Sequence, residues 1–188
     1  WKIDGDSKLL KPVEVTLNYR DIPMNGSPKK ICIYSIGENK ALKPITEKVN
    51  NLDKSLTAYA ELSGKAILAM YNKSFNDTEK HWAYEIVDTI AAHHIMNGYD
   101  DGSFKPGREM SRAEFVKTFI SGLHLDDAAI QSKDEQIFAD VSANHWAKKY
   151  INIAYKKGWV SGSQGKFNPN DPISREQMVS ILMRAYKD

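Results

Sequence analysis

Two hydrophobic periods divide the chain near Ser74. Before this residue, apolar side chains alternate with polar ones over 13–19 and again over 56–62. The segments 30–36 and 66–71 are rich in β-branched and other apolar residues, which is typical of strands. Prolines and glycines mark the gaps between these segments. The pattern predicts four or five antiparallel strands that form a small β-sandwich or part of one.

In the rest of the chain the hydrophobic period is helical. Trp82, Ile86 and Ile90 lie four residues apart, which places them on one side of a helix. A second apolar stripe runs through 115–120. We expect Trp82, and its counterpart Trp146 further along the chain, to pack in the core of this region. The whole chain is therefore predicted to belong to the α+β class.

The helical region repeats itself with a period of 63–64 residues. Each copy reads as a helix, a glycine-rich turn, a short extended segment, a proline and a second helix. The matching residues are Phe75-x-Asp77 and Phe138-x-Asp140, His81-Trp82-Ala83 and His145-Trp146-Ala147, Gly98 and Gly162, Phe104 and Phe167, and Ser111-Arg112 and Ser174-Arg175.

These patterns predict four ranges along the chain. A β-rich module covers 1–74, a first repeat 75–125, a linker 126–137 and a second repeat 138–188. A unit of roughly 50 residues cannot bury its apolar faces alone, and such repeats commonly stack three or more at a time. Two copies are therefore expected to be an incomplete set.

Charge, hydropathy and cysteine content exclude several classes of protein. The 26 basic and 24 acidic side chains leave a net charge of +2, less than a strongly basic nucleic-acid-binding protein carries. No stretch approaches the ~20 apolar residues that a membrane span needs. Cys32 is the single cysteine, which excludes an internal disulfide framework and a cysteine-based zinc cluster. Neither nucleic acid nor insertion into a membrane is expected.

Two helix starts carry the signature of a capping box. Ser111 precedes Glu114 by three residues, and Ser174 precedes Gln177 by the same spacing. In a capping box the serine hydroxyl accepts from the backbone N–H three residues on, and the acidic or amide side chain reaches back to the serine N–H. This structural role is sufficient to explain all four residues.

Arg112 and Arg175 occupy the first helical position after these caps, where the helix dipole is positive. A cation there is unfavourable by a few tenths of a kcal/mol or more, and its presence in both copies suggests a purpose. An arginine beside helix N–H groups forms a site for an anion, above all a planar carboxylate or a phosphate. The alternative is a salt bridge from each arginine to an acid of the neighbouring repeat.

The glycine-rich turn does not have the pattern of a metal site. Gly98 permits left-handed backbone, and the acidic residues 100–101 invite comparison with a calcium loop. Counted as such a loop, the segment has Arg108 where a glutamate is required. The adjacent His93 and His94 also lack the spacing of metal ligands. A tight turn is predicted, with no metal site and no cofactor.

The repeated motifs resemble those of the S-layer homology (SLH) repeat over 75–188. The shared features are Phe-x-Asp, His-Trp-Ala, Gly-Tyr-Asp-Asp-Gly-Ser-Phe-Lys-Pro and Ser-Arg-Ala-Glu-Phe, and the copies at 111–115 and 174–178 are similar to the first and second repeats of the family. Family members usually carry three repeats in a pseudo-threefold helical prism. The resemblance implies part of such a prism here. We expect either a longer parent with a third repeat or a two-repeat protein completed by a neighbouring chain.

The resemblance implies a non-covalent cell-wall anchor, secreted and held at the bacterial surface. Its ligand would be an anionic secondary cell-wall polysaccharide, with a pyruvylated sugar whose carboxylate meets Arg112 or Arg175. The helix starts are expected to assist, through Ser111, Glu114, Ser174 and Gln177.

Further sugar contacts are expected around the two turns. Tyr99 and Lys105 are expected to line a groove beside the first turn, and Trp159 to contact carbohydrate near the second. The turn glycines Gly98 and Gly162 complete the expected ligand-binding set.

Two alternatives remain open, and neither makes this chain an enzyme. The chain could be a structural S-layer lattice subunit acting through protein–protein contacts and self-association, or the anchoring tail of a larger cell-surface polysaccharide hydrolase. Glycoside hydrolysis needs two carboxylates held across a cleft, and the repeats show no matched pair. The segment 161–165 fails the Gly-x-Ser-x-Gly motif because its glycines stand one residue too close together.

Overall fold

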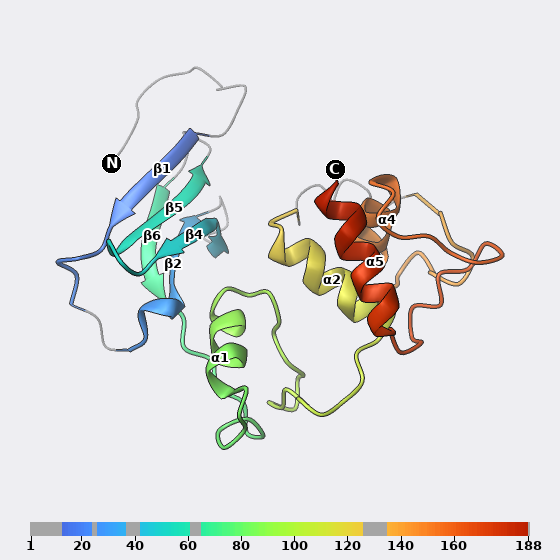
Figure 1. Ribbon diagram of the computed structural model, residues 1–188, viewed down its shortest axis with the longest axis horizontal. Helices are drawn as coiled ribbons and strands as arrows, with labels where there is room; N and C mark the ends of the chain where they lie inside the picture. The colour runs from blue at the N-terminus through green and yellow to red at the C-terminus, as the bar shows by residue number, and fades with distance from the viewer. Residues whose placement is uncertain (1–12, 24–25, 37–41, 61–64, 126–134, 188) are drawn as a thin grey trace. The chain divides into compact units, whose positions relative to one another are not determined.

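A computed structural model describes residues 13–23, 26–36, 42–60, 65–125 and 135–187 (Figure 1). The chain divides into two compact units, Trp1–Pro106 and Gly107–Asp188. The end of the predicted strand 56–62 and most of the predicted linker 126–137 lie outside the described residues. The fold is α+β, as predicted, with antiparallel strands followed by helices.

The first unit begins with two three-stranded antiparallel sheets. One sheet has the order β1-β5-β4, from β1 (Val13–Asn18), β5 (Ser55–Ala60) and β4 (Thr46–Asn50). The other has the order β3-β2-β6, from β3 (Leu42–Pro44), β2 (Ile31–Ile36) and β6 (Lys65–Met70). The strands β3 and β4 are too short or too polar to stand out in the hydrophobic pattern.

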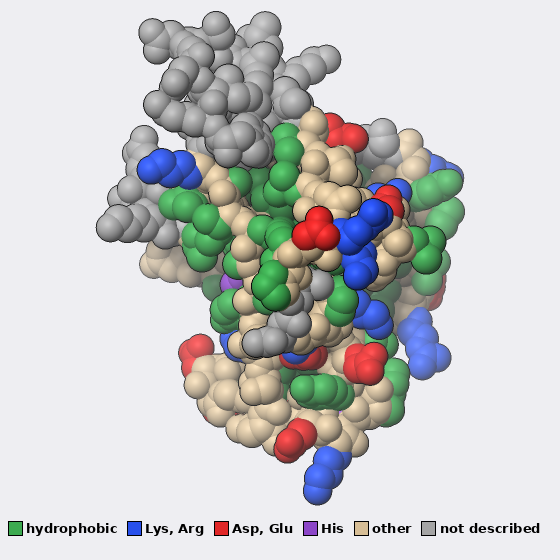
Figure 2. Space-filling view, turned by 90° about the vertical axis from the view of Figure 1, so that its left-hand side faces the viewer, with side chains coloured by type: hydrophobic (Ala, Val, Ile, Leu, Met, Phe, Trp, Pro, Cys, Tyr) green, Lys and Arg blue, Asp and Glu red, His purple; other side chains and the backbone are tan. Residues whose placement is uncertain are grey.

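The two sheets share one core, which makes this part of the chain a β module with sandwich character. Its buried side chains come from both sheets and from the turn after β1: Tyr19, Ile31, Ile33, Leu56 and Ala58. On the face shown in Figure 2, basic and acidic side chains stand among hydrophobic ones.

Helix α1 (Tyr84–Ala92) packs against the β module at the short 3-10 helix η1 (Pro28–Lys30). Lys30 forms a buried ion pair with Asp88 of the helix. The Tyr34 hydroxyl donates to the Ala92 carbonyl at 3.2 Å. The first helix of the first repeat is therefore part of the same compact unit as the β module.

The second unit contains α2 (Arg112–Gly122), α4 (Lys148–Lys156) and α5 (Arg175–Tyr186). Helix α2 packs against α4, and all three helices contribute to one apolar core. The boundary after Pro106 falls inside the predicted first repeat, 75–125, because its two helices pack against different partners. The division of the chain into a β-rich module, two repeats and a linker stays a prediction. The arrangement of the repeats in a pseudo-threefold prism also stays a prediction.

The prediction that Trp82 and Trp146 pack in the core is wrong. Their side chains are 85% and 55% exposed. The helices begin only at Tyr84 and Lys148, so each tryptophan lies in the preceding turn and the helical phase does not apply to it. Each indole lies against the histidine before it in the chain instead.

Candidate functional site

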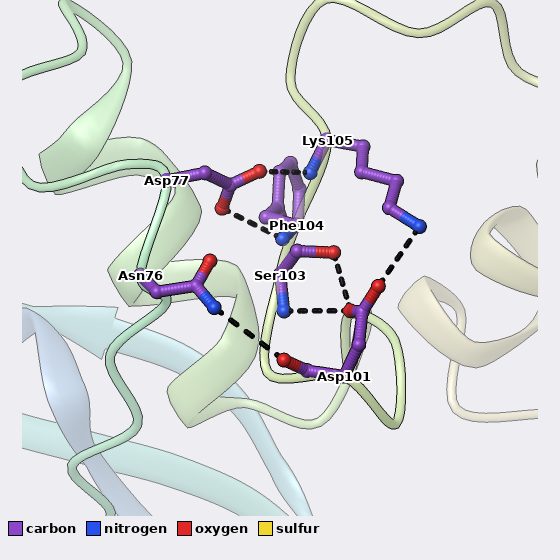
Figure 3. A network of polar contacts seen from close by, with 6 residues as sticks. All are labelled: Asn76, Asp77, Asp101, Ser103, Phe104 and Lys105. Carbon is purple, nitrogen blue, oxygen red and sulfur yellow. Dashed lines mark hydrogen bonds and ion pairs between the residues drawn. The ribbon is translucent and has the colours of Figure 1, made fainter.

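The aspartate of the first Phe-x-Asp motif fixes the turn that follows α1. Its carboxylate accepts from the backbone N–H groups of Phe104 at 2.8 Å and Lys105 at 2.7 Å (Figure 3). Lys105 has φ +58°, a left-handed conformation that is costly for a side-chain-bearing residue. The hydrogen bond from the Phe104 N–H is the main reason that the pKa of Asp77 lies below its usual value. Asp77 therefore holds a strained backbone segment in place.

The second copy repeats this arrangement. Asp140 accepts from Phe167 N–H at 2.8 Å and from Asn168 N–H at 2.7 Å, and Asn168 has φ +56°. Burial works against ionisation of Asp140, yet the backbone N–H donors, together with the charge of Lys166, outweigh it and lower its pKa. In the sequence, these aspartates stand out only as residues that the two repeats share. In both copies the aspartate lies 27 and 28 residues before the two amides that it binds, and this constant spacing is the sequence signal that could have indicated the contact.

Around the first turn, the predicted groove residues Tyr99 and Lys105 do lie together. The Lys105 ammonium is 4.4 Å from the centroid of the Tyr99 ring and 3.0 Å from the Asp101 carboxylate. Hydrogen bonds from the Ser103 hydroxyl and N–H, followed by the Lys105 contact, lower the pKa of Asp101 to about 2. Figure 3 shows Asp101 between Ser103 and the Lys105 ammonium. The lysine charge is thus largely compensated within its own turn.

The two turn glycines make room for phenylalanine rings. A Cβ on Gly98 would stand 2.2 Å from the Phe75 ring, and one on Gly162 would stand 2.4 Å from the Phe138 ring. Gly98 also has φ +66°, which favours glycine. Close packing under the turn is therefore sufficient to explain both glycines, and their role in ligand binding stays a prediction.

Both capping boxes are confirmed. Ser111 accepts from Glu114 N–H while Glu114 accepts from Ser111 N–H, and Ser174 and Gln177 exchange the same pair of hydrogen bonds. Glu114 also forms an ion pair with Arg108. The four residues thus cap the N-termini of α2 and α5, and a direct ligand contact by any of them stays a prediction.

Arg112 is held against the turn of the second repeat. Its Nε donates to the Phe167 carbonyl at 3.0 Å and its Nη2 lies 3.4 Å from the Ser161 carbonyl. The guanidinium also lies over the Phe167 ring, 4.7 Å from the centroid. Burial lowers its pKa, whereas the charges of Asp171 and Asp140 act in the opposite direction. Among the described residues, its hydrogen-bond acceptors are carbonyl oxygens rather than the carboxylate of a salt bridge.

The backbone at this helix start is also occupied. Arg112 N–H donates to the Asp171 carbonyl at 2.9 Å, and Ala113 N–H donates to the Pro169 carbonyl at 3.0 Å. The first amides of α2 are therefore paired with the second repeat rather than open to an anion. Recognition of a negative charge at this end of α2 rests on the arginine side chain.

Arg175 has a different environment from Arg112. It occupies the same first position, in α5, yet its side chain is exposed. The two arginines are equivalent in sequence, but only Arg112 has a turn of the described chain placed across it. This difference arises because a following repeat covers the start of α2.

Trp159, predicted to contact carbohydrate, is buried. Its ring meets Phe119 edge-on with centroids 5.5 Å apart, and the Lys157 ammonium lies 4.9 Å from its centroid. Its indole Nε1 is buried without a hydrogen-bond partner among the described residues. Trp159 is thus buried and Trp82 and Trp146 are exposed, which is the reverse of what the sequence pattern predicts. A sugar contact at Trp159 stays a prediction that its burial does not support.

Two general features bear on the class of site. The described residues contain no group of three or more histidine, cysteine or acidic side chains placed to hold a metal ion. Within the same residues, no helix has the length and apolarity that crossing a membrane requires. The clustered features of the second unit are instead a fixed arginine, a strained turn and an aspartate that stabilises it.

The sequence model of the S-layer homology domain matches the chain twice, at residues 74–116 and 137–179. Amylopullulanase of Thermoanaerobacterium thermosulfurigenes is 32% identical over 186 residues, which are 98% of this chain and 10% of that protein. The S-layer protein sap of Bacillus anthracis is 32% identical over 64% of the chain and 14% of its own length. The cellulosome-anchoring protein of Acetivibrio thermocellus is 29% identical over 57% of the chain and 24% of its own length.

The chain thus spans only about a tenth to a quarter of these relatives. The matching domain is a binding and anchoring module, and its occurrence in S-layer proteins indicates a cell-surface, cell-wall-associated location. The two family matches coincide with the two copies of the turn that Asp77 and Asp140 stabilise. The chain is therefore a member of the S-layer homology domain family and carries two tandem domains of it.

Proposed function

We propose that this chain anchors its parent protein to the bacterial cell wall by binding an anionic, pyruvylated secondary cell-wall polysaccharide. The binding site in this proposal lies where α2 meets the turn 161–168 of the second repeat. The chain would act there as a carbohydrate-binding module and would catalyse no reaction.

The single observation that carries the proposal is the position of Arg112. Carbonyl oxygens orient its guanidinium, and the nearby charges of Asp171 and Asp140 act on it although, among the described residues, neither carboxylate accepts a hydrogen bond from it. A half-buried cation attracts an anion more strongly than one in bulk water, because the effective dielectric constant is lower there. A guanidinium also matches the planar geometry of a carboxylate, which a pyruvyl group supplies.

The test is calorimetric titration of the chain with purified wall polymer, either native or chemically stripped of pyruvate. We expect binding to the native polymer and little to the stripped one. Arg112→Ala should weaken binding by roughly tenfold to a hundredfold, the loss expected for one charge-assisted hydrogen bond. Equal binding to both polymers would overturn the role of the carboxylate.

Arg175→Ala is the matched control, because Arg175 has the same position in its helix but an exposed side chain. The fraction of folded protein must be measured for Arg112→Ala, since the substitution removes hydrogen bonds to Phe167 and Ser161. Arg112→Lys separates charge from geometry by keeping the cation and losing the planar fork. Stronger loss of binding in Arg175→Ala than in Arg112→Ala would contradict the proposed position of the site.

One comparison favours a second, compatible proposal, in which the chain is the anchoring part of a larger cell-surface polysaccharide hydrolase. The similarity to amylopullulanase covers 98% of the chain, so it includes the region before the first repeat. We expect no hydrolysis of pullulan or starch by the isolated chain. Measurable hydrolysis by the purified chain, abolished by none of the arginine substitutions, would contradict the proposed division of roles.

A further inference from the structure

The peptide group between Asn97 and Gly98 lies in the first unit, in the segment that follows α1. Both residues are exposed, and neither belongs to a helix or a strand. Because Gly98 has no side chain, nothing on that residue shields its backbone nitrogen. Within the described residues, the Gly98 N–H has no hydrogen-bond acceptor and the Asn97 side-chain amide has no hydrogen-bond partner. The backbone nitrogen and the side-chain amide carbon are therefore both available for reaction with each other.

A lysine contacts the same peptide group on its carbonyl side. The Lys73 ammonium donates to the Asn97 carbonyl oxygen at 2.5 Å. The equivalent carbonyl of the second repeat, that of Ser161, also accepts from a cation, the guanidinium of Arg112. Oxygen and nitrogen of an amide share one resonance system, so a cation on the oxygen stabilises the anion that forms when the N–H loses its proton. Lys73 thus assists the loss of the amide proton of Gly98.

We propose that Asn97 is a site of spontaneous deamidation and that Lys73 accelerates the reaction. The Gly98 nitrogen gives its proton to water and attacks the side-chain carbon Cγ of Asn97, which forms a succinimide. The bond between Cγ and Nδ2 breaks, and Nδ2 takes up a proton from water and leaves as ammonia. A water molecule then opens the ring. Cleavage of the new bond between the Gly98 nitrogen and Cγ gives aspartate, whereas cleavage of the original peptide bond gives isoaspartate.

The reactive pair is confined to the first repeat. The equivalent residues of the second repeat are Ser161 and Gly162, and serine has no side-chain carbonyl carbon that a backbone nitrogen could attack. Conversion of Asn97 adds one negative charge to a chain whose net charge is +2. The first turn therefore changes its charge with time, while the second turn does not.

The two products differ in the length of their backbone. Isoaspartate carries the main chain through its side chain and so inserts one methylene group before Gly98. The turn has no room for this, because Gly98 lies so close to the Phe75 ring that a Cβ would stand 2.2 Å from it. Isoaspartate at position 97 should loosen the turn and lower the melting temperature, whereas aspartate should leave the fold intact.

The test is to incubate the full chain in neutral buffer and to follow residue 97 by peptide mapping and mass spectrometry. We expect Asn97 to be converted into a mixture of aspartate and isoaspartate. Lys73→Met should slow the conversion by roughly twofold to fivefold, the effect of one exposed charged contact, and Lys73→Arg should restore it. Lys80→Met is the matched control, because it removes the same charge from an exposed lysine of the same repeat. Asn97→Ser, which copies the second repeat, should give no conversion.

Three results would contradict separate steps of this argument. If Asn97 stays an amide over a time in which a synthetic peptide of residues 94–101 is fully converted, the site does not exist in the folded chain. Equal rates for wild type and Lys73→Met would exclude the role of the lysine. The isoaspartate product, separated by ion exchange, is finally compared with Asn97→Asp, which has the charge without the longer backbone. Equal melting temperatures of these two proteins would exclude strain against Phe75.

Discussion

The thiol of Cys32 and the imidazole of His93 are hydrogen-bonded, with 3.0 Å between Sγ and Nδ1. The other ring nitrogen, Nε2, lies 2.9 Å from the Lys29 carbonyl, which can only accept. Nε2 therefore carries the proton of the neutral ring, and Nδ1 accepts from the thiol. The His93 side chain thus ties the C-terminal end of α1 to strand β2 through Cys32 and to the segment before it through Lys29.

His93→Ala is expected to lower the free energy of unfolding by about 1–3 kcal/mol, because two hydrogen bonds of about 0.5–1.5 kcal/mol each are lost. It should also speed reaction of the buried Cys32 with a thiol-specific reagent under native conditions. Urea denaturation and the labelling rate measure the two effects. His145→Ala, in the second unit, should leave the labelling rate unchanged. An unchanged labelling rate in His93→Ala would show that the imidazole does not protect the Cys32 thiol from the reagent.

The ion pair of Lys30 and Asp88 is buried, so removing one partner leaves an uncompensated charge. Lys30→Met is expected to destabilise the first unit by about 3–5 kcal/mol, whereas Lys30→Met with Asp88→Leu should cost much less. A double-mutant cycle in urea measures the coupling. The exposed pair of Lys29 and Glu85 is the control, with an expected coupling of about 1 kcal/mol or less. Similar couplings for the two pairs would contradict the role of burial.

Gly98→Ala and Gly162→Ala are each expected to destabilise the fold by about 1–3 kcal/mol, because the new methyl group overlaps a phenylalanine ring. The cost at Gly98 should be the larger, since its positive φ adds backbone strain. Gly107→Ala is the matched control, because a Cβ there meets open space. Thermal unfolding measures all three. Equal stability of Gly162→Ala and Gly107→Ala would argue against the close packing under the second turn.

The turn aspartates should make stability depend on pH. The pKa values of Asp77 and Asp140 are lowered in the folded state, so their stabilising contribution is complete above about 3.9, the usual value of an unfolded aspartate. It is lost as the pH falls through the lower folded-state pKa. Urea midpoints of Asp77→Asn and Asp140→Asn should therefore lie below wild type at pH 7 and approach it in acid. Asp100→Asn, at an exposed position of the first turn, should follow wild type throughout.

The local sequence determined the repeat and much of its chemistry. The capping boxes at Ser111 and Ser174 form as their spacing predicts, because a cap depends on residues three positions apart. The alternation in the first part of the chain predicts strands, because side chains of a strand point alternately to its two faces. These features depend on neighbours along the chain, which a sequence contains directly.

Only the tertiary structure decided whether residues at equivalent positions of the two repeats have the same contacts and the same burial. Arg112 and Arg175 share a motif, yet only Arg112 lies across a following turn. Trp159 is buried, although the pattern favoured burial of Trp82. Burial depends on which element packs against a residue, and in the case of Arg112 and Phe167 that element lies 55 residues away along the chain. A repeated motif predicts the same local structure twice, but the position of each copy in the stack determines what covers it.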